Sequence, residues 1–182
     1  MLLLVASFVQ GQSVYESFLN ETSSLYVQAK PFLLADKPLS FISFPVVKSR
    51  LHDELKRYLP DSTLQTLLKN GTTESVGQMW DGSLLNDVQL VHKDQIDTIL
   101  GSVVVANQGE SKRAYKKNMA LIKSKRGIVY FFSHPAFDDE RRFALLRVII
   151  ACGNGCGEHR FVLFKKEDTK WIKVGELYRM MS

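Results

Sequence analysis

The sequence predicts an α+β domain, in which a mainly helical first half packs on an antiparallel sheet built by the second half. From residue 127 onward the chain shows four apolar, β-rich runs, "IVYFFSHPAF", "RFALLRVIIAC", "EHRFVLFKK" and "KWIKVGELYRM". Their connections have hairpin lengths, and successive strands joined by short turns form an antiparallel meander, here of four strands. Pro135 has no amide hydrogen for the ladder, so we expect the first strand to break there.

The first half of the chain carries helix signals. Apolar residues at helical spacing predict helices over residues 14–28 and 50–59. Ser62 and Gln65 form a capping box, which predicts that a further helix begins there, and Asn70-Gly71 predicts its end. Because the run of strands follows these helices, the pattern favours the α+β class.

Shorter elements are predicted in the rest of the first 126 residues. Prolines punctuate the apolar stretch "PFLLADKPLSFISFPVV", which we expect to be extended. Asp81-Gly82 predicts a turn, "DVQLV" a strand and "KDQIDTIL" a short helix. "SVVVA" is one more strand candidate, and residues 112–126 again have helical spacing.

The N-terminus predicts export. Residues 2–9 form an uncharged apolar run of signal-peptide length, far below the ~20 residues that a membrane-spanning helix needs. Small residues follow at Val9-Gln10-Gly11, so we expect residues 1–11 to be a signal peptide and residues 12–182 to form a single α+β domain. The alternative is a buried first strand or helix. No cysteine lies near the cleavage site, which disfavours a lipid anchor and favours a periplasmic or secreted protein.

The two cysteines predict a disulfide that closes a hairpin. Cys152 and Cys156 flank Gly153-Asn154-Gly155 between two strand-like runs, where the chains come within bridging distance. A zinc site would need more ligands than these cysteines and His159 supply. A nucleophilic cysteine is also disfavoured, because a spacing of three along a strand places Cys156 and His159 on opposite faces. We therefore expect a Cys152–Cys156 bridge and no metal.

His134 is the strongest catalytic candidate among the histidines, because Asp138 and Asp139 follow it in the same turn. Such a cluster would suit general acid–base chemistry in a small hydrolase, or would hold a cation. The alternative is a solvated hairpin turn, whose acidic side chains are balanced by Arg141 and Arg142. We favour the turn, because no nucleophile or oxyanion donor accompanies the histidine.

Charge and motifs exclude several classes of protein. The chain has 182 residues, 45% of them hydrophobic, and a formal charge of +5, so it forms one domain with a core and a moderate preference for anionic surfaces. Nucleotide-binding, α/β-hydrolase and zinc-protease signatures are absent, and we expect no cofactor.

The segment 112–126 contains seven basic residues and no acidic one. An exposed face shared by Lys112, Arg113, Lys116 and Lys117 would bind an anionic surface, and this binding would weaken as salt rises. The simpler interpretation is a solvated helix face. The segment lacks the interleaved aromatic residues of single-strand binders, so nucleic acid is not the expected partner.

A series of short motifs runs through the last third of the chain: a Gly-Ile strand, Ser-x-Pro-x-Phe, a Cys-Gly loop and a Lys-Lys…Lys-Trp hairpin. In these motifs the chain resembles a group of uncharacterised exported bacterial proteins. The matching residues are Gly127, Ser133, Pro135, Phe137, Cys152, Gly153, Cys156, Gly157, Lys165, Lys166, Lys170 and Trp171. The chain departs from the group at two places. Thr169 stands where the group has a glycine before Lys-Trp, and "LYRMMS" stands where the group has a more aromatic ending. The resemblance implies export and a similar fold, without an activity, a substrate or a catalytic residue.

The Lys-Trp ending is also similar to that of cone-shaped folds of the nuclear-transport-factor-2 type, in which helices cup a curved sheet around a pocket. This cone is the alternative fold. The function we expect is binding or interaction in the cell envelope without catalysis, with a protein or an envelope component as partner. The alternative is a small hydrolase. A deep pocket where His134 meets Asp138 or Asp139 would favour the enzyme, and a flat apolar patch would favour interaction.

Overall fold

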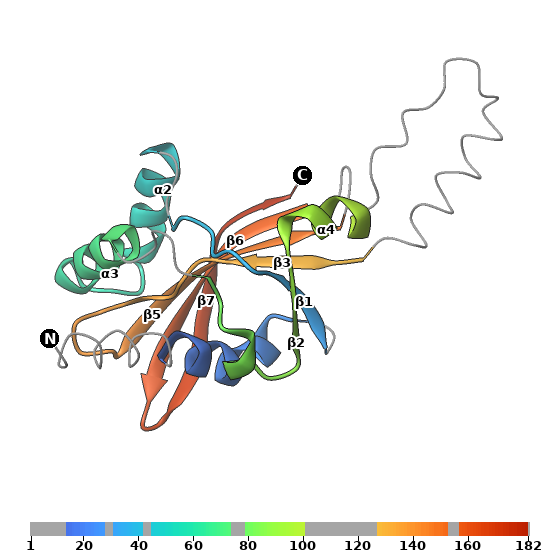
Figure 1. Cartoon of the computed structure of the whole chain (residues 1–182). Coiled ribbons are helices and arrows are strands. Elements are labelled where there is room, and N and C mark those ends of the chain that lie inside the picture. Colours follow the sequence, from blue (N-terminus) through green and yellow to red (C-terminus); the bar gives the residue numbers. More distant parts are fainter. Residues whose placement is uncertain are drawn as a thin grey trace, which may run out of the picture.

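One mixed sheet runs through the molecule, with helices on both of its faces (Figure 1). The computed structural model describes residues 14–27, 31–41, 45–73, 79–100, 127–152 and 157–181. Its strands are β1 (Phe32–Ala35), β2 (Val88–Val91), β3 (Val129–Phe132), β4 (Ala136–Phe137), β5 (Phe143–Ala151), β6 (Gly157–Glu167) and β7 (Lys170–Met181). Its helices are the N-terminal helix (residues 14–22), the 3₁₀ turns η1 (Ser23–Leu25) and η2 (Gly82–Leu84), and α2 (Pro45–Leu55), α3 (Asp61–Thr73) and α4 (Lys93–Ile99).

The C-terminal meander confirms the predicted α+β class. The strand order is β2-β1-β3-β5-β6-β7, in which β3 pairs with β5, β5 with β6 and β6 with β7, each in antiparallel. β4 continues the line of β3, since both pair with β5. Pro135 lies between β3 and β4, so the predicted break in the first strand is confirmed.

Two strands from the first half extend this sheet, and they are parallel. β1 pairs in parallel with β2 on one side and with β3 on the other. α2 and α3 separate β1 from β2 along the chain, and α4 follows β2 before β3. Long crossovers of this kind bring the chain back to the start of the sheet, which parallel pairing requires. The sheet is therefore mixed. The predicted antiparallel meander forms one part of it, and β1 and β2 add parallel pairs that were not predicted.

α2 begins earlier than predicted. It starts at Pro45, within the stretch that we expected to be extended. Proline suits the first position of a helix, because the amide hydrogen that it lacks would have no helical partner there and its fixed φ already fits the helix. The stretch is therefore extended only in its first part, which contains β1, and its last proline, Pro45, begins a helix.

α3 also exceeds its predicted bounds. It begins at Asp61, so Ser62 lies inside the helix and does not cap it, and it continues through Asn70-Gly71 to Thr73. The reason lies in tertiary packing. A Cβ atom on Gly71 would lie 2.7 Å from Cγ of the buried Phe41, so the glycine allows this ring to rest on the helix backbone. Here the glycine serves close packing and does not end the helix.

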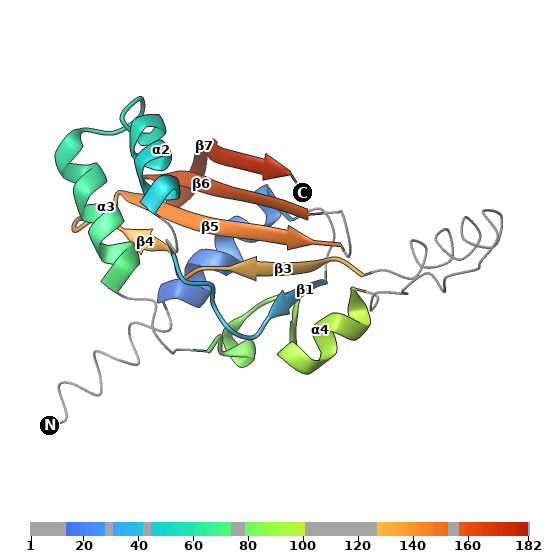
Figure 2. The ribbon, with the colours of Figure 1, turned by 90° about the horizontal axis from the view of Figure 1, so that it is seen from above.

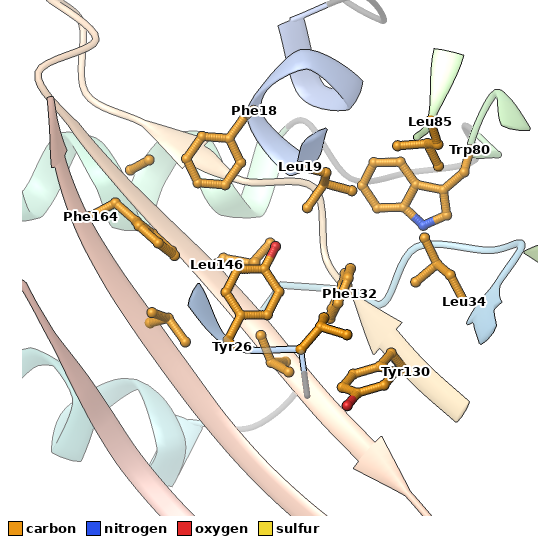
Figure 3. Packing of buried hydrophobic residues seen from close by; sticks show 14 of the residues in the cluster. Phe18, Leu19, Tyr26, Leu34, Trp80, Leu85, Tyr130, Phe132, Leu146 and Phe164 are labelled. Atoms are coloured by element: carbon orange, nitrogen blue, oxygen red, sulfur yellow. The ribbon is translucent and has the colours of Figure 1, made fainter. Parts of the chain in front are cut away.

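Alternate side chains of the central strands form two apolar clusters on opposite faces of the sheet. On one face, Leu146 and Phe164 pack with Phe18 and Leu19 of the N-terminal helix (Figure 3). On the other face, the cluster combines side chains from α2, α3 and the strands, among them Leu51, Leu55, Leu67, Leu145 and Leu163. Full burial of one such side chain stabilises the fold by roughly 2 kcal/mol. The sheet is thus covered on both faces.

α4 confirms the predicted short helix, and its apolar side chains Ile96, Ile99 and Leu100 pack on a smaller cluster around Val91 and Val129. Figures 1 and 2 show α2, α3 and α4 on one side of the sheet and the N-terminal helix on the other. This three-layer arrangement differs from the alternative cone, in which helices cup a curved sheet around a pocket.

Candidate functional site

A cleft lies between the N-terminal helix, the turn that joins β4 to β5, and the β6–β7 hairpin. It has a volume of about 270 Å³, and its lining includes Phe18, Glu21, Phe137, Arg141, Lys166 and Trp171. A second cavity of about 180 Å³ shares Val14, Phe137 and Arg141 with it. We call the first space the cleft and the second the side cavity.

The N-terminal helix forms one wall of the cleft. Val14, Ser17, Phe18 and Glu21 lie on one face of the helix, because they follow its spacing of three to four residues. Oε1 of Glu21 accepts a hydrogen bond of 2.6 Å from the backbone N–H of Trp171. This bond ties the end of the helix to β7 at the edge of the cleft.

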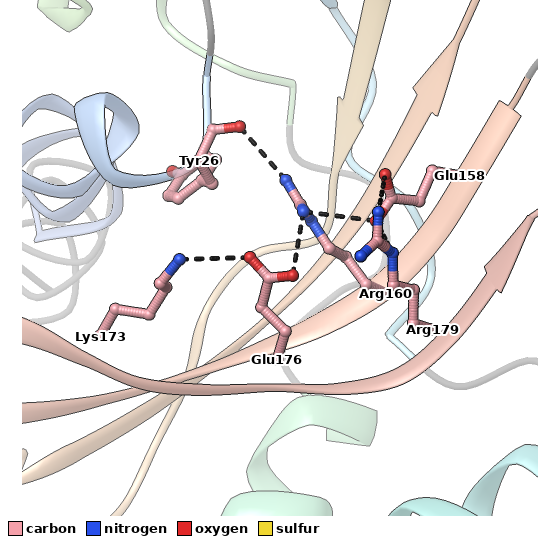
Figure 4. Close-up of polar contacts among 6 residues, drawn as sticks. All are labelled: Tyr26, Glu158, Arg160, Lys173, Glu176 and Arg179. Carbon is pink, nitrogen blue, oxygen red and sulfur yellow. Dashed lines mark hydrogen bonds and ion pairs between the residues drawn. The ribbon is translucent and has the colours of Figure 1, made fainter.

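A buried arginine holds the segment after this helix against the sheet (Figure 4). Nη2 of Arg160 donates to the carbonyl of Tyr26 at 3.2 Å, and Nη1 contacts Glu176 at 3.1 Å and Glu158 at 3.3 Å. Burial raises the pKa of Glu176, but Arg160 and Lys173 lower it more, so the pKa lies below its usual value. The guanidinium therefore connects β6, β7 and the N-terminal segment.

Three aromatic rings form the apolar wall. The ring of Phe18 meets Trp171 at 5.2 Å and Phe137 at 5.6 Å between centroids, in both cases edge to face. The rings of Phe137 and Trp171 are 5.7 Å apart. Edge-to-face contact is a preferred geometry of aromatic pairs and holds each ring in place. Phe18 and Phe137 are buried and Trp171 is partly exposed, so the indole offers the accessible surface.

The β4–β5 turn places Arg141 at the cleft. The N–H of Arg141 donates to the carbonyl of Asp138 at 2.9 Å, and Oδ1 of Asp138 accepts from the N–H of Phe143 at 2.7 Å. Arg141 has a φ of 53°, in the left-handed region that non-glycine residues rarely adopt. Such a conformation costs about 1 kcal/mol or more, and residues of this kind cluster at functional sites.

The β6–β7 hairpin presents Lys166 and Trp171 as a cross-strand pair. Its turn is Asp168-Thr169, with Asp168 at a φ of 52°, so the predicted hairpin forms with Thr169 in place of glycine. Lys166 is paired in register with Trp171, and its ammonium group lies 5.7 Å from the centre of a ring of the indole. This distance is within the range of a cation–π interaction.

The cleft carries an excess of positive charge. Within the described part of the chain, neither the guanidinium of Arg141 nor the ammonium of Lys166 forms an ion pair or hydrogen bond. Glu21 also lines the cleft, with one oxygen engaged by Trp171. Asp138 and Asp139 line the side cavity instead. The two spaces therefore differ in charge, and an anion is favoured in the cleft.

His134 lies apart from both spaces. The residue is 4% exposed, and its ring stacks on Tyr15 at 4.7 Å and meets Trp80 at 4.8 Å. Its Nδ1 is buried without a hydrogen-bond partner among the described residues. Burial lowers the pKa of His134 to about 4. The imidazole is therefore a neutral member of an aromatic stack at neutral pH.

The acidic residues after His134 belong to the turn. Arg142 lies 2.9 Å from Glu140 and 3.8 Å from Asp138, so it balances the turn as expected, whereas Arg141 lines the cleft. Among the described residues, no hydrogen bond or ion pair joins His134 to Asp138 or Asp139. The structure does not bring the candidate acid–base residues together.

The residues of the C-terminal motifs have several roles. Oγ of Ser133 accepts from the N–H of Arg147 at 3.0 Å, which supports the strand break at Pro135. Phe137 and Trp171 line the cleft. Gly157 begins β6, and Cys152 follows β5.

Several predicted features lie outside the described residues: the signal peptide (residues 1–11), Gly153, Cys156, Lys112, Arg113, Lys116 and Lys117. The Cys152–Cys156 bridge and the basic face therefore stay predictions. In the part that the structure describes, no group of three or more His, Cys, Asp or Glu side chains is placed to hold a metal ion. No helix described there is long and apolar enough to cross a membrane.

Sequence reasoning missed the cleft, because its residues come from separate segments: the N-terminal helix, the β4–β5 turn and the β6–β7 hairpin. The one local signal was the Ser-x-Pro-x-Phe and Lys-Trp pattern, which contains Phe137, Lys166 and Trp171. Comparisons with protein-family models, with curated proteins and with solved structures find no match for this chain.

Proposed function

We propose that this chain is an exported protein of the cell envelope, which binds a ligand in the cleft and carries out no catalysis. The observation that carries the proposal is the combination of an aromatic wall with two cations that have no charged partner among the described residues. Arg141 and Lys166 are exposed at the cleft, where their charges lie beside the aromatic wall, and a few polar groups next to apolar rings are typical of ligand sites.

The surroundings of His134 support binding over hydrolysis. A general base must reach the proton that it removes, and the ring of His134 is enclosed by Tyr15 and Trp80. One carboxylate oxygen of Asp138 accepts a hydrogen bond from the backbone N–H of Phe143. These residues hold together the turn and the aromatic stack next to the cleft.

Export is supported by the apolar run of residues 2–9 and by the two cysteines. The proposed bridge between Cys152 and Cys156 would close the β5–β6 hairpin, and no cysteine is free in the described part of the chain. Expression with the native N-terminus in an exporting host tests both points by intact mass. A chain that starts at Gln12 and resists alkylation until reduction supports export and the bridge. A full-length chain with two reactive thiols contradicts them.

Binding is tested by filling the cleft. Ser17 is exposed on the cleft face of the N-terminal helix, so Ser17→Trp should occupy the space without a change of charge. Ser24→Trp is the matched control, because Ser24 is exposed on η1 and does not line the cleft. The melting temperature of each protein is measured with and without a small-molecule extract of the envelope.

We expect the extract to raise the melting temperature of the wild type and of Ser24→Trp, and to leave Ser17→Trp unchanged, because bound ligand stabilises the folded state. No shift in the wild type, or an equal shift in all three proteins, would overturn the proposal that the cleft is a binding site.

A further inference from the structure

We infer, on the basis of the proposed function, that the ligand of the cleft is a small anion that carries a flat aromatic group. Its charged end lies at Arg141 and Lys166, and its ring lies against Trp171 and Phe137. The class of ligand follows from the charge, the ring geometry and the size of the cleft.

The two cations line the same cleft from exposed positions. Arg141 extends from a turn whose backbone is left-handed, and the ammonium of Lys166 lies 5.7 Å from the indole of its cross-strand partner Trp171. A guanidinium offers several donors in a plane that matches a carboxylate or a phosphate, and a neighbouring ammonium adds a point charge. Since neither group has a charged partner in the described residues, an anion would meet both without breaking an existing ion pair.

The acidic residues around the cleft determine how the ligand is oriented in it. Asp138 and Asp139 line the side cavity, so they would repel an anion from that side of Arg141. Glu21 has one oxygen engaged by the backbone of Trp171. The anionic end is therefore favoured between Arg141 and Lys166, and the rest of the ligand extends toward the rings.

The rings select an aromatic body. Trp171 is partly exposed, whereas Phe18 and Phe137 lie behind it with little free surface. A flat group would stack on the indole, because offset-stacked aromatic pairs are stabilised beyond the area that they bury. Since the cleft measures about 270 Å³, it lies near the lower end of ligand pockets and suits a small molecule.

2-Naphthoate is the probe, because it combines a flat bicycle with one carboxylate. 2-Naphthamide keeps the ring without the charge, and cyclohexanecarboxylate keeps the charge without the aromatic ring. Binding is followed by the indole N–H signals of Trp80 and Trp171 in a nitrogen–proton spectrum, assigned with Trp80→Phe. Only the Trp171 signal should move, because Trp80 is buried away from the cleft.

The variants are Arg141→Asn and Lys166→Gln. Asparagine tolerates the left-handed backbone at position 141, so it removes the charge and keeps the turn. Lys165→Gln is the matched control, because Lys165 is the neighbour of Lys166 on β6 but pairs with Glu167 and does not line the cleft. Each variant is titrated with the probe after its melting curve shows a folded protein.

We expect 2-naphthoate to bind about tenfold more tightly than either analogue, and Arg141→Asn and Lys166→Gln each to weaken it by about tenfold, the size of one charged hydrogen bond. Lys165→Gln should bind like the wild type. Equal binding of the amide, or an equal loss in Lys165→Gln, would overturn the inference.

The two proposals fail in different ways. Suppose that the envelope extract stabilises the wild type but not Ser17→Trp, and that 2-naphthoate does not displace the ligand bound from the extract. The cleft is then a binding site for another class of ligand, and this inference is wrong. If Ser17→Trp responds to the extract like the wild type, the proposed function itself fails.

Discussion

The imidazole of His134 lies between the rings of Tyr15 and Trp80, with 4% of the residue exposed. Transfer of a charged imidazolium into this stack would cost free energy, because the surrounding rings replace water. The pKa of His134 is accordingly lowered to about 4 by burial. The same histidine therefore makes the fold sensitive to acid.

We expect His134→Phe to reduce the loss of stability in acid. The folded-state pKa of about 4 lies below the ordinary value of 6.5. The unfolded chain therefore binds the proton more readily, so stability is complete above pH 6.5 and falls as the pH drops toward 4. The loss from this residue approaches about 3 kcal/mol. Urea unfolding midpoints at several pH values measure it.

The control for this prediction is His52→Gln on the surface of α2, which removes a histidine without a change in the core. His159 adds to the acid sensitivity of the wild type, because burial and then Arg147 lower its pKa to about 4. Part of the slope will therefore persist in His134→Phe. The explanation is wrong if His134→Phe and His52→Gln lose stability in acid to the same extent.

Arg160 is a second residue whose burial decides its role. Replacement by methionine should lower the free energy of unfolding by about 2 kcal/mol, because the Tyr26 carbonyl loses its donor and the partly buried Glu176 keeps only Lys173 as a partner. Arg179→Gln is the matched control. Arg179 binds Glu158 at 2.8 Å from an exposed position, and exposed pairs contribute about 1 kcal/mol or less. Equal losses in the two variants, measured by urea unfolding, would contradict this view.

At the scale of secondary-structure elements, α3 shows how tertiary contacts override a local signal. Gly71→Ala should destabilise the protein by about 1–3 kcal/mol through overpacking, although alanine favours an isolated helix by about 1 kcal/mol. The added Cβ would lie 2.7 Å from Cγ of Phe41, which is fully buried and has no room to move. Thermal or urea unfolding measures the change.

A double-mutant cycle with Phe41→Leu checks the cause. The smaller side chain frees space above Gly71, so Gly71→Ala should cost less in the Phe41→Leu background than in the wild type. An unchanged cost would show that the backbone of α3, and not the ring, sets the effect.

The elements that were predictable from sequence are those with local causes. The four C-terminal runs, their short links and the break at Pro135 depend on neighbouring residues, and the structure confirms them. The predicted start of α2 at residue 50 and the predicted end of α3 at Asn70-Gly71 were wrong. A proline can occupy the first turn of a helix, and a glycine beneath a packed ring can lie inside one. Local propensity does not contain that information.

At the scale of the whole molecule, pairing and the cleft were not predictable. β1 lies in parallel between β2 and β3, although long stretches of chain separate the three strands. The cleft in turn needs the N-terminal helix, which the buried Arg160 and the Glu21–Trp171 bond hold against the sheet. His134 and Asp138 are near in sequence, yet no hydrogen bond or ion pair joins them in the part of the chain that the structure describes. Proximity along the chain was therefore a poor guide to the site.

The three apolar clusters predict unequal stability across the sheet. β5 and β6 are central strands with side chains in both large clusters, whereas β2 is an edge strand whose Val91 packs in the small cluster under α4. We expect amide hydrogens of β5 and β6 to exchange most slowly and to open only on global unfolding. Those of β2 and α4 should exchange earlier, through local opening.

Val91→Ala tests whether the β2–α4 part opens by itself. Val91 is 1% exposed, so its truncation should destabilise the small cluster by on the order of 2 kcal/mol. Hydrogen exchange read by mass spectrometry should then become faster in β2 and α4, with β5 and β6 unchanged. If all four elements become faster by the same factor, the sheet unfolds as one cooperative unit. The parallel and antiparallel parts of the sheet would then have the same free energy of unfolding, although their side chains pack in separate clusters.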